Sequence, residues 1–168
     1  MIIIKVGDIT QESTGVIVNA ANAQLKGGGG VDGAIHRAAG PSVMAECKKI
    51  GICPTGQAVI TDGGNLSAKK IIHTVGPVWQ GGQEGEPILL KSAYENSFLL
   101  AREHGLRTIA FPAISTGVYG YPKEDAAAIA LNLGMKFESD FEKIIFVCYS
   151  QADFEIYKRV WNNLQSFL

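Results

Sequence analysis

Short apolar runs rich in β-branched residues alternate with longer segments of helical periodicity, and this alternation constrains the fold more than any other feature. The runs predict six strands, at 2–6, 15–19, 57–61, 70–75, 107–111 and 143–149. The longer segments predict four helices, at about 33–50, 88–104, 123–138 and 151–166. This order of elements is typical of an α/β protein.

The predicted strands are continuously apolar, as in a sheet that helices cover on both faces. The first two strands follow one another without a helix between them, so we expect a mixed sheet. The predicted fold class is therefore α/β, a three-layer α/β/α sandwich around a mixed, mostly parallel six-stranded sheet, formed by one domain over residues 1–168. A chain of 168 residues with 46% hydrophobic residues can bury roughly two-thirds of its unfolded surface.

Charge and cysteine content exclude several classes of function. Fifteen basic and sixteen acidic residues leave a net charge of −1, which is no strong signal for nucleic acid binding. No apolar run is long enough to span a membrane, and "MIIIKV" is too short for a signal peptide core. Three cysteines without C-x-x-C spacing favour neither disulfides nor a zinc knuckle. We therefore expect a cytoplasmic protein without a metal site. We also expect it to be a monomer and to need no cofactor.

The stretch "LKGGGGVDGAIHRAAG" at 25–40 contains G-x-G-x-x-G, the pattern of dinucleotide-binding loops. In that class the loop follows its strand directly, and an acidic residue about 20 positions later binds the ribose. Here eight residues separate the strand from Gly28, and 48–53 contain no carboxylate. A nicotinamide-dependent oxidoreductase is therefore disfavoured. A P-loop is excluded because Ala34 and Ile35 stand where Lys and Ser or Thr are required.

Two loops nevertheless have the character of anion-binding sites. Glycines before a helix let backbone N–H groups face an anion, so residues 28–31, the first loop, favour phosphate binding over a merely flexible connection. Residues 115–119, the second loop, follow the strand at 107–111 and offer N–H groups and hydroxyls. Ser115 resembles the serine of a nucleophile elbow, but "VYGYP" delays the next helix, so an activated nucleophile is not expected. Two such loops at the carboxyl ends of strands predict a diphosphate site.

Polar residues near the first loop have both structural and functional interpretations. Asn19 is expected to fix the adjacent loop backbone, and Asn22 either forms a turn or reaches the ligand. Asp32 is either the N-cap of the following helix or a water-activating carboxylate whose pKa bound phosphates would raise. Asp8 is a turn carboxylate or an acceptor for an adenine amine. His73 is expected in the core, as a structural residue.

The chain resembles the macrodomain family, and especially its MacroD-type subgroup, which includes bacterial O-acetyl-ADP-ribose deacetylases. The resemblance rests on "GDIT" at 7–10, "VNAAN" at 18–22, "GGGGVDGAIHRAAGP" at 28–41, "HTVGP" at 73–77 and "FPAISTGVYGYP" at 111–122. These motifs span nearly the whole chain in the family's order. The segment rich in Cys and His that marks zinc-containing macrodomains is not found.

The resemblance implies an ADP-ribose site with roles for particular residues. Asp8 would accept from the adenine amine, Ile9 would offer its backbone N–H to the ring, and Tyr149 would stack on adenine. The first loop, Gly28, Gly29, Gly30 and Val31, and the second loop, Ser115, Thr116, Gly117, Val118 and Tyr119, would hold the diphosphate, with the Tyr119 ring against the distal ribose. Asn22 and Asp32 would be catalytic, since Asn22 would hold the distal ribose and Asp32 would position the attacking water.

The implied reaction is hydrolysis at the distal ribose, with help from the substrate's own phosphate. Substrates would be O-acetyl-ADP-ribose and proteins that carry mono-ADP-ribosyl esters on Asp or Glu. The alternative is a reader module that binds ADP-ribose without chemistry, because fold alone does not choose between the two. The Asn22/Asp32 pair favours the hydrolase, since pure readers commonly lack it.

Overall fold

The computed structural model describes residues 1–166 and confirms the predicted strands and most of the predicted helices. The strands are β1 (Ile2–Val6), β2 (Val16–Ala20), β3 (Ala58–Asp62), β4 (Lys70–Thr74), β5 (Thr108–Phe111) and β6 (Lys143–Cys148). The helices are α1 (Gly30–Ala39), α2 (Pro41–Ile50), α3 (Glu86–Glu103), α4 (Lys123–Phe137) and α5 (Gln151–Gln165). Two short 3-10 helices, η1 (Ile9–Gln11) and η2 (Glu138–Asp140), complete the described elements.

The six strands form one mixed sheet in the order β1-β6-β5-β2-β4-β3. All neighbouring pairs are parallel except β3 and β4, which are antiparallel, so the predicted mixed and mostly parallel sheet is confirmed. From β2 the chain continues toward the β4 side of the sheet, whereas from β5 it continues toward the β6 side. The carboxyl ends of β2 and β5 therefore lie together at a topological switch point, where open α/β sheets bind ligands.

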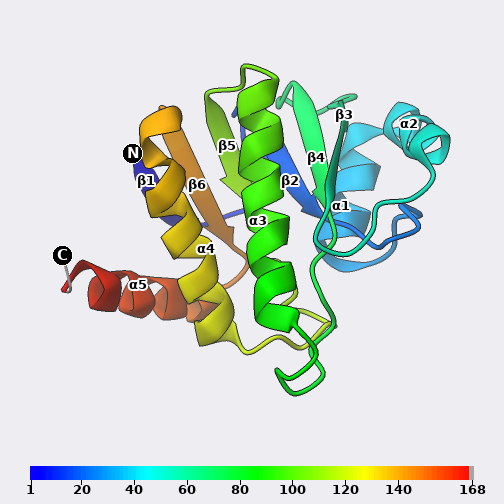
Figure 1. The fold of residues 1–168 in the computed structure, drawn as a ribbon. Coiled ribbons are helices and arrows are strands. Elements are labelled where there is room, and N and C mark those ends of the chain that lie inside the picture. Colours follow the sequence, from blue (N-terminus) through cyan, green and yellow to red (C-terminus); the bar gives the residue numbers. More distant parts are fainter. Residues whose placement is uncertain (167–168) are drawn as a thin grey trace.

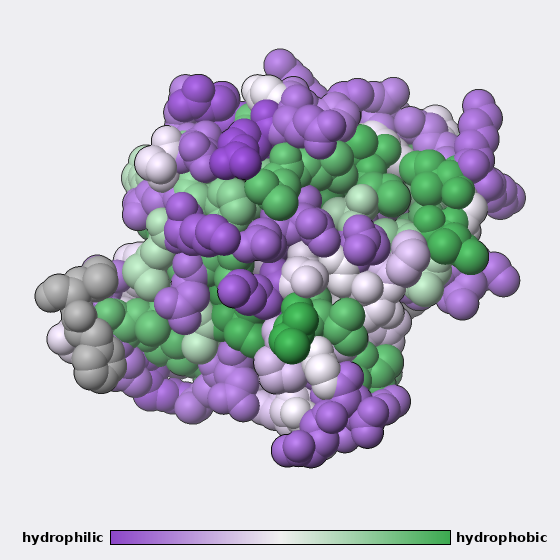
Figure 2. All heavy atoms as spheres, viewed as in Figure 1, coloured by the Kyte–Doolittle hydropathy of each residue, from purple (hydrophilic) through white to green (hydrophobic). Residues whose placement is uncertain are grey.

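Helices cover both faces of the sheet, which confirms the three-layer sandwich (Figure 1). Side chains alternate along a strand, so Val16 and Val18 of β2 face one layer and Ile17 faces the other. The first layer contains α3, α4 and α5 and is rich in aromatic residues, such as Phe98 against Phe111 with ring centroids 4.7 Å apart. The second layer contains α1 and α2. On the face that α3 and α4 cover, hydrophilic side chains surround smaller hydrophobic areas (Figure 2).

The helix predicted over 33–50 is in fact two helices, and it begins earlier than expected. Gly40 has a φ of 88°, outside the helical region, and Pro41 begins α2. The proline has no N–H to continue the hydrogen bonds of α1, so the chain turns there. The prediction for α5 is confirmed at its start, where the Ser150 hydroxyl accepts the N–H of Asp153 at 3.1 Å.

The loop before α3 is organised around Glu86, the first residue of that helix. Its carboxylate accepts the backbone N–H groups of Gln80 at 2.7 Å, Gly82 at 3.0 Å and Glu84 at 2.7 Å. Burial alone would raise the pKa of Glu86, but these donors outweigh it and lower the pKa to about 2. The loop residues 80–85 are thus largely exposed, but their backbone is held by one buried carboxylate, that of Glu86.

Replacing Glu86 with glutamine is expected to lower the melting temperature near neutral pH, because a neutral amide offers one acceptor oxygen to three donors. The pKa of Glu86 in the folded protein lies below its ordinary value of 4.5. The stabilisation by the carboxylate is therefore complete above about pH 5 and is lost as the pH falls toward about 2. Thermal unfolding near pH 7 and near pH 3 should show the difference between the two proteins shrinking in acid, while Glu84→Gln changes little. A difference that is independent of pH would contradict the prediction.

Two other expectations concern membranes and thiols. Among the residues that the structure describes, no helix combines the length and the apolar character needed to cross a membrane. Cys47, Cys53 and Cys148 are all buried free thiols. Burial raises the pKa of each thiol above its ordinary value of 9.0, to about 11 for Cys47 and Cys53 and about 12 for Cys148. All three are therefore neutral, unreactive thiols near pH 7.

Candidate active site

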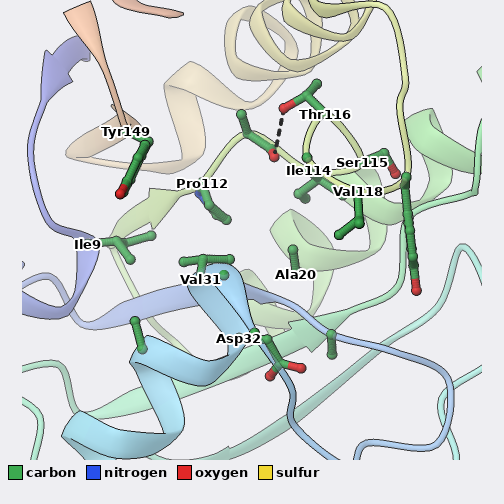
Figure 3. Close-up of a pocket in the computed structure, with 18 of the residues that line it drawn as sticks. Ile9, Ala20, Val31, Asp32, Pro112, Ile114, Ser115, Thr116, Val118 and Tyr149 are labelled. Carbon is green, nitrogen blue, oxygen red and sulfur yellow. Dashed lines mark hydrogen bonds between the residues drawn. The ribbon is translucent and has the colours of Figure 1, made fainter.

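A cavity of about 930 Å³ lies at the carboxyl edge of the sheet. The loops after β1, β2, β5 and β6 line it, together with the beginning of α1. Every site residue expected from the sequence lies on its wall: Asp8, Ile9, Asn22, Gly28, Gly29, Gly30, Val31, Asp32, Ser115, Thr116, Gly117, Val118, Tyr119 and Tyr149. Ile9 and Tyr149 lie at one end, and Val118 and Ser115 lie toward the other, with Val31 and Asp32 below (Figure 3).

The first loop presents backbone N–H groups to this cavity. Gly27 and Gly30 have φ values of 76° and 58°, in the left-handed region that glycine adopts without strain. The N-cap of α1 is Gly29, and no side chain caps the helix. The N–H groups of the first turn are therefore available to a ligand, and the positive end of the helix dipole favours an anion there.

Gly33 allows α1 to pass directly beneath the first loop. A β-carbon at this position would lie 2.2 Å from the carbonyl oxygen of Gly28, far inside van der Waals contact. That neighbour is backbone and has no rotamer through which to move away. Gly33 therefore sets the distance between the helix and the loop, which the glycine fingerprint in the sequence does not reveal.

Replacing Gly33 with alanine is expected to displace the first loop and to destabilise the fold by about 1–3 kcal/mol, the usual cost of overpacking. Urea unfolding measures the free energy, and amide NMR shifts of residues 27–31 report the displacement. Gly29→Ala is a matched control, because nothing lies within 4 Å of its added β-carbon and its φ of −94° suits any residue. Unchanged stability and unchanged amide shifts in Gly33→Ala would show that the loop tolerates the methyl group.

The second loop closes the opposite side of the cavity. Ser115 is buried and has a φ of 68°, which is uncommon for a residue other than glycine and turns the backbone sharply. Its hydroxyl has no hydrogen-bond partner within residues 1–166, so no base activates it, as expected from the sequence. Gly76 packs beneath it, since a β-carbon there would lie 2.1 Å from Ser115 Oγ. Thr116 adds a local bond from its hydroxyl to Ala113 O at 3.2 Å (Figure 3).

Asp32 lies inside the first turn of α1 and does not cap the helix. The N-cap interpretation was wrong because Gly29 takes that position and the helix begins three residues earlier than predicted. The Asp32 side chain is almost completely buried and accepts an N–H of the Asn19 amide at 2.8 Å. His36, one turn later, has Nε2 3.4 Å from Asp32 Oδ1.

The pKa of Asp32 is raised from its ordinary value of 3.8. Burial is the main cause, whereas the hydrogen bond from Asn19 and the charge of His36 act in the opposite direction. The sequence suggested a raised pKa through bound phosphates. In the structure, burial by the protein itself raises the pKa of Asp32. A carboxylate with a raised pKa is suited to exchanging protons with water.

Asn19 has a different role from the one expected. It lies within β2, fully buried, and its amide holds Asp32 rather than the loop backbone. The same nitrogen lies 3.1 Å from Nδ1 of His73, its register partner on β4, and Asn19 Oδ1 has no partner in the described chain. His73 is a buried, hydrogen-bonded core residue, as expected, with Nε2 2.9 Å from Thr61 Oγ1.

Nitrogen and sulfur atoms of His36, Cys47 and His73 lie within 4.8 Å of one another, a grouping that the sequence did not predict. The two imidazole rings are stacked, with centroids 5.9 Å apart and planes inclined by 25°. Stacked rings do not point their lone pairs at one shared ion. Both nitrogens of His73 are also engaged by Asn19 and Thr61. The grouping is therefore a hydrogen-bonded cluster, and we assign no metal to it.

Asn22 and Asp8 support the loops that carry them. The Asn22 amide donates to Gly27 O at 2.7 Å and accepts from Lys26 N at 3.0 Å, so it shapes the approach to the first loop. Oδ1 of Asp8 accepts the N–H and the hydroxyl of Thr10 at 3.0 and 2.7 Å. The second oxygen of Asp8 remains for a ligand donor. Tyr149 is 93% exposed, so its ring is available at the mouth of the cavity.

Several residues on the cavity wall were missed from the sequence. Arg37 follows Gly33 by one helical turn and brings a cation beside the first loop. Lys123 and Asp153 form an ion pair at 2.7 Å behind the second loop. The i, i+4 spacing of Gly33 and Arg37 on a predicted helix indicates that Arg37 lies beside the first loop, so Arg37 could have been found from the sequence. Lys123 and Asp153 are 30 residues apart, and nothing in the sequence indicates that they form an ion pair.

Fold and site together define an α/β/α domain whose ligand cavity is built from loops and a helix N-terminus at the carboxyl edge of a mixed sheet. Residues 18–130 match the family model described as Macro domain, so the chain belongs to the macrodomain family. This confirms the resemblance that the motifs suggested.

Several relatives and solved structures are similar to this protein over most of the chain. An O-acetyl-ADP-ribose deacetylase of Citrobacter koseri is 56% identical over 161 residues, 92% of this chain and 91% of the relative. A macro domain-containing protein of Chlorobaculum tepidum is also 56% identical, over 90% of each chain. The Oceanobacillus iheyensis macrodomain solved with ADP is 45% identical, with a TM-score of 0.93 over 97% of this chain and 90% of that one. The Trypanosoma brucei macrodomain in complex with ADP-ribose is 39% identical, with a TM-score of 0.87 over 94% of this chain and 68% of that one.

Proposed function

We propose that this macrodomain binds ADP-ribose and hydrolyses esters at its distal ribose, with O-acetyl-ADP-ribose and mono-ADP-ribosyl esters of Asp or Glu side chains as substrates. The observation that carries the proposal is the buried Asp32 carboxylate, which lies in the first turn of α1 on the wall of the cavity that the two loops also line. Relatives of 56% identity that are named O-acetyl-ADP-ribose deacetylases support the choice of a hydrolase.

The positions of the lining residues support one orientation of the ligand. Adenine would lie at the end with Ile9 and Tyr149, where Asp8 keeps one oxygen for the exocyclic amine. The diphosphate would lie between the first and second loops, which meet where β2 and β5 end. The distal ribose would then reach Asn22, Asp32 and the ring of Tyr119. Solved macrodomains with ADP and with ADP-ribose support this class of ligand.

Hydrolysis in this site needs no protein nucleophile. One water molecule divides between the products: its hydroxyl completes one product and its proton the other, giving a carboxylic acid and a free hydroxyl on ADP-ribose. Asp32 would hold this water with help from the substrate's phosphate. Its raised pKa brings the carboxyl group closer to the working pH, where proton exchange is efficient. The unpartnered Ser115 hydroxyl agrees with a mechanism that has no covalent intermediate.

A reader module that only binds ADP-ribose is the second candidate, because the two loops alone would suffice for binding. Purified protein offered O-acetyl-ADP-ribose and mono-ADP-ribosylated protein in parallel separates the candidates. Release of ADP-ribose with a stoichiometric amount of acid supports the hydrolase. Tight binding of ADP-ribose in calorimetry with no release from either substrate would establish the reader instead. Unequal rates identify the preferred ester.

We assign the chain to the MacroD-type subgroup on the combination of Asn22 and Asp32 in one cavity. We also propose that it works as a monomer in a reducing, cytoplasmic setting, which its three free thiols support. Size-exclusion chromatography with light scattering tests whether the protein is a monomer, and localisation of the tagged protein tests whether it is cytoplasmic.

A further inference from the structure

A chain of polar side chains runs from Asp32 into the core of the protein. The Asn19 amide nitrogen lies 2.8 Å from Asp32 Oδ1 and 3.1 Å from His73 Nδ1, and His73 Nε2 lies 2.9 Å from Thr61 Oγ1. Asn19, His73 and Thr61 are all buried. Neither Asn19 nor His73 belongs to the cavity wall, so neither can touch a ligand directly.

The donors and acceptors in this chain determine which nitrogen of His73 carries the proton. The Asn19 amide nitrogen can only donate, and its two N–H bonds are directed at Asp32 and at His73 Nδ1. His73 Nδ1 must therefore accept, so the proton is on Nε2. That N–H points at the Thr61 hydroxyl, which itself donates to Asp62 O at 3.0 Å.

We propose that His73 is a positioning residue for Asp32, and that it acts through the orientation of the Asn19 amide. This inference rests on the proposed function, in which Asp32 holds the attacking water. A proton on Nδ1 would oppose the amide N–H and turn the amide around. Asn19 Oδ1 would then face the Asp32 carboxylate, acceptor against acceptor, and the carboxylate would lose its fixed place. Asn19 Oδ1 has no partner in the described chain, so the observed orientation serves Asp32 and His73 alone.

The surroundings of His73 keep its ring neutral. Three titratable groups contact His73. The His36 ring is stacked on the His73 ring, and the Cys47 Sγ lies 3.8 Å from His73 Nε2. The Cys53 Sγ lies 3.9 Å from the backbone oxygen of His73. The Asp32 carboxylate contacts the same Asn19 amide nitrogen as His73 Nδ1, so the amide lies between the carboxylate and the ring, and the two make no direct hydrogen bond. Burial, and then the charge of His36, lower the pKa of His73 to about 3, so the accepting Nδ1 persists at neutral pH.

Two isosteric substitutions separate the two halves of the ring. His73→Asn places an amide oxygen near the position of Nδ1 and can still accept from Asn19. His73→Gln places an amide nitrogen near the position of Nε2 and can still donate to Thr61, but it leaves no acceptor at the position of Nδ1, where the Asn19 amide donates. Both remove the imidazole, and asparagine fills less of the buried space than glutamine, so a role in packing alone would impair His73→Asn at least as much as His73→Gln.

We expect His73→Gln to lower kcat for O-acetyl-ADP-ribose by roughly 10- to 100-fold, the usual effect of a misplaced catalytic group, with KM and ADP-ribose affinity unchanged. His73→Asn should restore most of that loss. The carboxyl ¹³C signal of Asp32 should titrate at a higher pH in His73→Gln than in the wild type or His73→Asn, because the Asn19 hydrogen bond lowers the pKa of Asp32. Equal losses in both variants, or an unchanged Asp32 titration in His73→Gln, would overturn the proposal.

Imidazole ¹⁵N spectra of the wild-type protein complete the test without any substitution. A proton on Nε2 of His73 supports the proposal, and a proton on Nδ1 overturns it even if both variants fail to fold. The spectra and the Asp32 titration do not depend on turnover. If the wild type binds ADP-ribose but releases nothing from either ester, the proposed function fails while the link between His73 and Asp32 is still measured.

Discussion

Replacing Asp32 with asparagine is expected to lower the turnover of O-acetyl-ADP-ribose by roughly 10²- to 10⁴-fold, the range in which positioned acids and bases contribute. Asparagine keeps the shape of the side chain and can still accept the N–H of Asn19, but it cannot take a proton from water. In the proposed mode of binding both loops hold the ligand mainly through backbone groups, so we expect ADP-ribose affinity to be largely retained. Single-turnover release of ADP-ribose and calorimetry measure the two quantities separately.

Asn22→Ala is the informative comparison for that experiment. The Asn22 amide bonds to the backbone of Lys26 and Gly27, so its loss should loosen the approach to the first loop as well as slow turnover. Undiminished turnover in both variants would remove this pair from the mechanism. A loss of affinity as large as the loss of rate would mark the residue concerned as one that holds the ligand.

Acidification is expected to destabilise the protein from about pH 6.5 downward, because His73 is neutral in the folded state and takes up a proton only when the chain unfolds. Its pKa is about 3 in the folded protein against an ordinary value of 6.5. Between these values the unfolded chain binds the extra proton, so stability is complete above about pH 6.5 and falls as the pH drops toward 3. The loss approaches 1.4 kcal/mol per pH unit and about 5 kcal/mol in total, as an upper bound.

Urea unfolding at several pH values between about 7 and 4 measures this slope. His73→Gln, which has no proton to gain in this range, should unfold with a much flatter dependence on pH. The raised pKa of Asp32 acts in the opposite sense in both proteins, and its further rise expected in His73→Gln adds to the difference between the two slopes. Parallel slopes for the wild type and His73→Gln would contradict the prediction.

Much of the fold could be predicted because the information is local. Continuously apolar runs such as that of β6 indicate a strand covered on both faces, and the six predicted strands are those observed. The two errors at α1 are also local. Four successive glycines leave the start of the helix ambiguous, and Gly40-Pro41 ends it within a pattern that otherwise continues. Pro41 indicates a helix boundary in the sequence, but the prediction gave more weight to the helical periodicity on both sides of it.

The environment of Asp32 could not be predicted, because it depends on strand order. Asn19 and His73 are 54 residues apart and become neighbours only because β2 pairs with β4 in one particular register. The approach of Gly76 to Ser115 likewise requires two separate loops to meet. Motifs brought the right residues to one cavity wall, but the side chains behind that wall emerge only from the tertiary structure.

The three buried polar atoms without partners among the described residues, Asn19 Oδ1, His36 Nδ1 and Ser115 Oγ, all belong to the network around Asp32 or to the second loop. Native interiors rarely tolerate such groups, and each costs folding free energy on the order of 1–3 kcal/mol. A protein engineer seeking a more heat-resistant variant would therefore find the easiest gains at these positions. Selection for thermostability alone should then erode catalysis first, because stability and activity compete for the same few side chains.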